Sequence, residues 1–128
     1  MSSKKEMRIM VVDDMATSRG QILQALEDIG LFNTEISSDA MSAFKQVATK
    51  RVHMVISDYN MPGMDGLQLL KSLRGHPPTR GVGFILVTGR ADDATIARGR
   101  SLGMNNLLRK PFTSQAMKSC IEAVVGRL

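Results

Sequence analysis

The sequence has few of the residues that form disulfides, stack on nucleic-acid bases or cross a membrane. It contains one cysteine, one tyrosine and no tryptophan among 128 residues. The single cysteine, Cys120, cannot form an internal disulfide, which fits a reducing cytoplasm. No apolar run approaches the roughly 18 residues of a membrane span, and the run after the N-terminal lysines is too short for a signal peptide. We therefore expect a cytoplasmic protein with no membrane partner.

Histidine and glycine-rich loops are also scarce, and this excludes two kinds of site. The two histidines, His53 and His76, are isolated in the sequence, so a zinc site is not expected. The turn after the first apolar run reads DDMATSRG, and its glycine already lies within a predicted helix. Neither a dinucleotide-binding fingerprint nor a P-loop is therefore present.

The formal charge of +5 invites a nucleic-acid interpretation. The 17 basic residues, however, are scattered singly or in pairs along the chain, and there are almost no aromatic residues to stack on bases. We therefore expect no nucleic-acid partner. A surface with a basic bias would instead suit an acidic protein partner.

Short apolar runs alternate along the chain with segments of helical spacing. The runs that predict strands are 7–12, 33–37, 54–57, 83–87 and 106–109. Each is followed by a predicted helix, and the last two of these helices span 91–102 and 113–125. This alternation predicts one α/β domain, with an open, mostly parallel sheet covered by helices on both faces. We expect residues 1–6 to be a flexible tail and 7–128 to be the domain.

Polar side chains follow four of the predicted strands. They are Asp13 and Asp14 after the first, Asp58 after the third, Thr88 after the fourth and Lys110 after the fifth. Ligands of open α/β sheets bind at the carboxyl ends of the strands, so we expect these side chains to converge. Any one of them could simply cap a helix or be solvated, but the whole set favours a site.

The three acids of this set predict a metal ion. Carboxylates a few ångströms apart repel by about 1–4 kcal/mol per pair, so a cation should lie among them. Mg²⁺ is a hard cation that prefers oxygen ligands. A carboxylate beside Mg²⁺ can attack a phosphoryl group when the metal and a lysine neutralise the phosphoryl oxygens. Asp58, at the end of the central apolar run, is placed to become an aspartyl-phosphate.

Four motifs, VVDDM, VISDYNMPGMDG, ILVTG and LRKPF, occur in this order and resemble those of the receiver domain of two-component response regulators. The resemblance covers residues 7–128 and implies a flavodoxin-like, doubly wound sheet of five parallel strands in the order 2-1-3-4-5. The sequence ends at Leu128, so we expect no attached output domain, as in the stand-alone, CheY-like regulators of chemotaxis. Such a protein would be a monomeric switch that catalyses its own phosphorylation and dephosphorylation, and not a turnover enzyme.

The resemblance also implies roles for the acids and their neighbours. Asp58 would accept the phosphoryl group from the phosphohistidine of a CheA-like histidine kinase. Asp13 and Asp14, with Asp58, would position Mg²⁺. The backbone carbonyl of Asn60 would be a further ligand to the metal.

Further residues would act on the phosphoryl group once it is bound. The Thr88 hydroxyl would donate to one phosphoryl oxygen and the Lys110 ammonium to another, with a cis peptide bond between Lys110 and Pro111. Arg90, with Asn60, would border the path of the water that attacks the aspartyl-phosphate. These two residues would therefore modulate dephosphorylation.

The sequence departs from many chemotaxis regulators on the last strand. Those proteins carry an aromatic residue that turns inward after phosphorylation, whereas this chain has Leu107 at that position. We expect Leu107 to switch by packing alone, and we expect an output face made of the helix 91–102, the strand around Leu107 and the helix 113–125. The basic residues expected on this output face are Arg98, Arg100, Arg109 and Lys118.

The expected target is a flagellar motor switch protein or another protein, and a phosphatase is a further candidate partner. A phosphate sink, which drains phosphoryl groups from a shared chemotaxis kinase, is an alternative that the sequence does not separate from a motor-binding regulator. A metal-dependent phosphatase that forms an aspartyl-phosphate is less favoured. Its nucleophile is expected in a D-x-D pair on the first strand, where this chain has adjacent acids.

Overall fold

The computed structural model describes residue 4 and residues 6–128, so residues 1–3 and 5 of the predicted tail lie outside the described residues. Strands and helices alternate along the described part of the chain. The strands are β1 (Ile9–Val12), β2 (Thr34–Ser37), β3 (Met54–Asp58), β4 (Gly83–Thr88) and β5 (Asn106–Arg109). The helices are α1 (Ala16–Asp28), α2 (Ala40–Thr49), α3 (Gly66–Gly75), the 3₁₀-helix η1 (Pro77–Thr79), α4 (Asp93–Ser101) and α5 (Ser114–Val125).

The strands form one parallel sheet in the order β2-β1-β3-β4-β5. The predicted α/β class and the order 2-1-3-4-5 are therefore confirmed. The prediction of a fourth helix over 91–102 was too long at both ends. Asp92 is the N-cap of α4, with its carboxylate accepting from the Thr95 N–H, and the helix therefore begins at Asp93.

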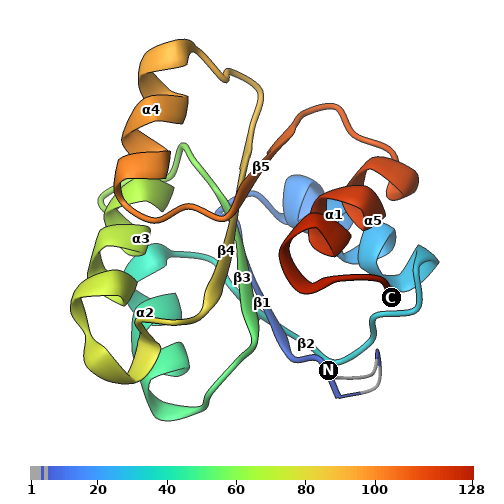
Figure 1. Cartoon of the computed structure of the whole chain (residues 1–128), viewed down its shortest axis with the longest axis horizontal. Helices are drawn as coiled ribbons and strands as arrows, with labels where there is room; N and C mark the ends of the chain where they lie inside the picture. Colours follow the sequence, from blue (N-terminus) through green and yellow to red (C-terminus); the bar gives the residue numbers. More distant parts are fainter. Residues whose placement is uncertain (1–3, 5) are drawn as a thin grey trace.

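The sheet lies between two layers of helices, and both of its faces are apolar. Figure 1 shows α1 and α5 on one side and α2, α3 and α4 on the other. In β1, Ile9 and Val11 pack on the side of α1 and α5, whereas Met10 and Val12 pack on the side of α2 and α3. Strands buried on both faces explain why the sequence shows continuous apolar runs in place of an alternating pattern.

The single cysteine belongs to this core. Cys120 lies on α5 and is buried, and burial raises the pKa of its thiol to about 11. Little thiolate is therefore present near neutral pH, and Cys120 acts as a small core residue. Among the helices that the structure describes, none combines the length and the apolar character needed to cross a bilayer.

Candidate functional site

Three carboxylates meet at the carboxyl ends of the two central strands. β1 and β3 are paired with Val12 opposite Ser57, so Asp13 and Asp58 follow in neighbouring positions. Both are buried, and Asp14 is partly exposed beside them. One oxygen from each of the three carboxylates lies within 4.8 Å of the others. The structure thus brings together the acids that the sequence placed at the strand ends.

The acid cluster has the donor set of a hard cation. The Asp14 Oδ1 atom is buried and has no hydrogen-bond partner among the described residues. A buried carboxylate oxygen without a partner is costly, and a metal ion would offset that cost. Three converging carboxylate oxygens suit Mg²⁺, which binds oxygen and keeps several waters. Asp13, Asp14 and Asp58 therefore fit the predicted metal.

Lys110 brings a positive charge to the acid cluster. Its Nζ lies 3.0 Å from Asp58 Oδ1 and 3.9 Å from Asp13 Oδ2. The peptide bond to Pro111 is cis, as the resemblance implied. Burial raises the pKa of the Asp58 carboxyl, while the hydrogen bond and the charge of Lys110 act in the opposite direction. Asp58 is therefore a poorly hydrated carboxylate held by one lysine.

Two residues of α1 that the sequence analysis assigned no role also contact Asp13. The Ser18 hydroxyl donates to Asp13 Oδ2 and accepts a hydrogen bond from Lys110 Nζ at 2.9 Å. The Arg19 guanidinium donates to the Asp13 backbone carbonyl at 2.7 Å. The signal that could have pointed to these residues is their position in the first turn of the helix that follows the acid pair.

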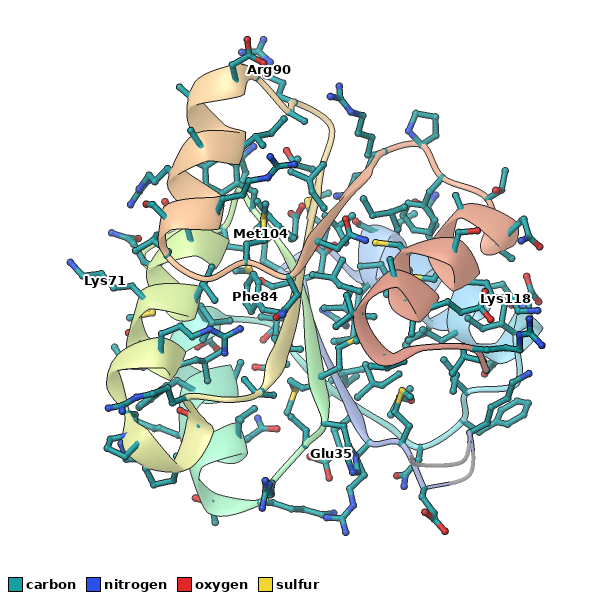
Figure 2. All side chains as sticks on the ribbon, viewed as in Figure 1. Glu35, Lys71, Phe84, Arg90, Met104 and Lys118 are labelled. Atoms are coloured by element: carbon teal, nitrogen blue, oxygen red, sulfur yellow. The ribbon has the colours of Figure 1, made fainter. Side chains whose placement is uncertain are left out.

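Thr88, Arg90 and Asn60 form no side-chain hydrogen bond or salt bridge with the three acids in the described part of the chain. The Thr88 hydroxyl donates to the Arg90 carbonyl at 2.8 Å and accepts from the Arg90 N–H at 3.1 Å. Arg90 and Asn60 are exposed. Figure 2 shows Arg90 at the end of the molecule where α4 begins. The roles assigned to these three residues stay predictions.

The segment after Asp58 is held close to the sheet by the start of α3. Asp65 forms a capping box with Gln68, and the Gly66 N–H donates to the Tyr59 carbonyl at 2.9 Å. A Cβ atom at Gly66 would clash with the backbone oxygen of Asp58 and lie 2.9 Å from Leu86 Cδ1. The first turn of α3 can therefore approach the Asp58 backbone this closely only because residue 66 is glycine.

The predicted output face surrounds the edge strand β5. Leu107 is half-buried and packs on the side of α3 and α4, whereas Leu108 faces the opposite core. Arg98 and Arg109 are exposed. Lys118 is partly buried on α5, and Figure 2 shows it on the opposite side of the sheet from α4. The basic residues therefore lie on β5 and on the helices α4 and α5, which cover opposite faces of the sheet.

Comparison with known proteins identifies close similarities. Residues 9–122 match the response regulator receiver domain family. The whole chain is 40% identical, over 128 residues, to the probable chemotaxis protein CheY of Rhizobium etli, and the match covers 99% of that protein. The fold is similar to that of a putative response regulator from Chloroflexus aurantiacus, with a TM-score of 0.88, 26% identity, and coverage of 96% of this chain and 100% of that one.

A third similarity concerns the fold alone. The receiver domain of a sensor histidine kinase from Pseudomonas aeruginosa gives a TM-score of 0.84 at 22% identity, covering 94% of this chain and 98% of that one. That structure has a magnesium ion coordinated in its active-site cleft.

Proposed function

Because the chain belongs to the response regulator receiver domain family, we propose that it accepts a phosphoryl group on Asp58 from a histidine kinase and thereby switches its binding to a target protein. The observation that carries this proposal is the contact of Lys110 Nζ with Asp58 Oδ1 at 3.0 Å, within a cluster of three carboxylates. An acid, a cation and a set of metal ligands are the parts that phosphoryl transfer to a carboxylate needs.

Asp13, Asp14 and Asp58 would hold Mg²⁺, which when bound supplies positive charge to the oxygens of the phosphoryl group in transfer. A magnesium ion in the cleft of the Pseudomonas aeruginosa receiver domain supports this assignment. Asp58 would attack phosphorus with a carboxylate oxygen, and the phosphohistidine nitrogen would leave. Lys110 lies close enough to Asp58 to donate to a phosphoryl oxygen.

Thr88 would donate a further hydrogen bond to the phosphoryl group and would transmit the effect of phosphorylation to the rest of the fold. Its hydroxyl donates a hydrogen bond to the backbone carbonyl of Arg90, so it has to rotate away from that carbonyl before it can donate to a phosphoryl oxygen. Such a rotation would open space under β5 on the side where Leu107 packs. Leu107 would then turn inward, and the output face around β5 would change its affinity for a flagellar motor switch protein or another target.

The stoichiometry of labelling tests the proposed chemistry. The native protein, incubated with a small phosphodonor and Mg²⁺, is expected to take up about one base-labile phosphoryl group per chain and to lose this uptake with a chelator. The group is base-labile because it is an acyl phosphate. Continuous hydrolysis of many phosphomonoesters would instead identify a phosphatase. Labelling that persists in excess chelator would contradict the metal-dependent mechanism.

Leu107→Ala tests the switch. The variant is expected to take up phosphate at nearly the native rate, because Leu107 packs among apolar residues and its side chain has no polar group to act on the phosphoryl group. Its gain in target affinity with a phosphoryl mimic should fall by about fivefold, since roughly 1 kcal/mol of packing no longer favours the active state. Leu107→Met, which conserves side-chain volume, is the control and should keep the native gain.

The comparison is made by titrating a purified motor switch protein with and without the mimic. If the gain in target affinity is unchanged in Leu107→Ala, Leu107 is a core residue with no part in switching. A phosphate sink would share the phosphoryl uptake but would show no gain in affinity for the motor protein, even in its native form.

A further inference from the structure

We propose that Ser18 is a positioning residue that directs Lys110 toward Asp58 and keeps it from pairing directly with Asp13. The inference rests on the proposed function, because it concerns the same phosphoryl-acceptor site. It arises from a chain of two hydrogen bonds that links Lys110, after β5, through Ser18 on α1 to Asp13, after β1. In this chain Lys110 donates to Ser18, and Ser18 donates to Asp13.

The direction of the two hydrogen bonds follows from the chemistry of the groups. An ammonium has no acceptor, so Lys110 must donate to the Ser18 oxygen. A serine hydroxyl has a single hydrogen, and it points to Asp13 Oδ2. Ser18 therefore stands as a neutral dipole between a cation and an anion, with its negative end toward Lys110 and its positive end toward Asp13.

The distances show what this dipole does. Lys110 Nζ lies 3.0 Å from Asp58 but 3.9 Å from Asp13, although the Asp13 side chain is fully buried and the Asp58 side chain is 10% exposed. Unscreened attraction to the more buried carboxylate would favour Asp13. Ser18 satisfies Asp13 Oδ2 and takes up one of the three ammonium hydrogens. The lysine can thus direct another hydrogen to Asp58.

The same arrangement leaves Asp13 available for a metal. Its Oδ1 accepts from the Met15 N–H at 2.9 Å, and its Oδ2 accepts from Ser18. Each oxygen has a second lone pair left for a cation. Without the Ser18 hydroxyl, Lys110 could close on Asp13 Oδ2 and form a direct ion pair there. That ion pair would compete with Mg²⁺ for Asp13 and would draw the ammonium away from the phosphoryl group on Asp58.

A double-mutant cycle on Mg²⁺ affinity tests this role. Ser18→Ala is expected to weaken Mg²⁺ binding about tenfold, the size of effect that outer groups have on metal sites. In a Lys110→Ala background the same Ser18→Ala change should cost less than about twofold, because there is no lysine left to compete. Ser18→Thr keeps the hydroxyl and should restore most of the affinity. The binding is measured by calorimetric titration of MgCl₂ into the metal-free proteins.

Two further measurements separate positioning from a general effect on α1. Alanine is a better helix former than serine, so loss of helix stability does not explain a weaker site in Ser18→Ala. Thr17→Ala, at the exposed neighbouring position of α1, is the matched control and should bind Mg²⁺ like the native protein. Ser18→Ala should also slow phosphoryl uptake at saturating Mg²⁺, because the lysine is misdirected even when the metal site is full.

The outcomes distinguish this inference from the proposed function. If Ser18→Ala lowers Mg²⁺ affinity equally with and without Lys110, the positioning role of Ser18 is overturned. The proposed function stays intact in that case, provided that the native protein binds Mg²⁺ and is labelled on Asp58. A native protein that neither binds Mg²⁺ nor takes up a phosphoryl group would overturn both. The role of Ser18 would be established if Ser18→Ala lowers Mg²⁺ affinity tenfold only when Lys110 is present, and if Ser18→Thr restores that affinity.

Discussion

Asp58→Asn is expected to abolish the uptake of a base-labile phosphoryl group from a small phosphodonor. The amide has almost the shape of the carboxylate and can still accept a hydrogen bond from Lys110, so the site keeps its geometry. It loses the nucleophilic oxygen that would form the acyl phosphate. The measurement is incorporation of labelled phosphate with Mg²⁺ present, followed by brief alkaline treatment.

Stability shows whether such a loss reflects chemistry or unfolding. The pKa of Asp58 is raised, chiefly by burial, so the folded protein binds a proton more tightly there than the unfolded chain does. The ordinary pKa of an aspartate, 3.8, applies to the unfolded chain, and the raised pKa applies to the folded protein. As the pH rises from 3.8 through the raised pKa, ionisation of Asp58 therefore lowers the free energy of unfolding. Above that range the metal-free Asp58→Asn protein should be at least as stable as the native one, since a charge has left a cluster of like charges.

Asp65→Asn is the matched control, because it makes the same chemical change seven residues along the chain. Asp65 caps α3 by accepting from the Gln68 N–H at 2.8 Å, and asparagine caps helices about as well as aspartate. This variant should take up phosphate like the native protein. Native labelling of Asp58→Asn would show that another residue is the acceptor. A loss in both variants would show that the chemistry depends on the loop and does not reside at Asp58.

The architecture and the acid cluster could be predicted because both follow from simple regularities. A strand buried on both faces must be continuously apolar, so runs such as MVIS mark the core strands without an alignment. Parallel strands place their carboxyl ends at one edge of the sheet. Polar residues that directly follow apolar runs therefore meet in space, as Asp13 and Asp58 do.

Contacts between a helix and a distant strand end could not be predicted in the same way. Ser18 contacts Lys110 across 92 positions of sequence, and a serine near the start of a helix already has ordinary explanations. The rotamer of Thr88 is likewise set by the turn at Arg90 and not by any periodicity. The start of α4 was placed too early because Asp92 is a cap, and an apolar pattern does not distinguish a cap from a first turn.

Gly66→Ala is expected to have the largest effect on stability of any single methyl addition to the site. The added Cβ would clash with the Asp58 carbonyl oxygen, which is backbone and cannot turn away as a side chain can. It would also press on Leu86, which is fully buried in the adjoining core. Overpacking of this kind costs about 3 kcal/mol, which lowers the melting temperature of a domain of this size by roughly 10 °C. Thermal unfolding of the metal-free protein measures the change.

Gly75→Ala provides the matched control at the opposite end of the same helix. A Cβ at Gly75 would meet nothing within 4 Å, and alanine is favoured over glycine in helices by up to about 1 kcal/mol. Gly75→Ala should therefore keep or raise the melting temperature, while Gly66→Ala lowers it. Because α3 can relieve the clash only by moving away from β3 or by displacing the Asp58 backbone, the folded fraction of Gly66→Ala should also take up phosphate more slowly than the native protein. Equal melting temperatures for the two variants would mean that α3 can shift without cost, and that its close approach does not fix the position of Asp58.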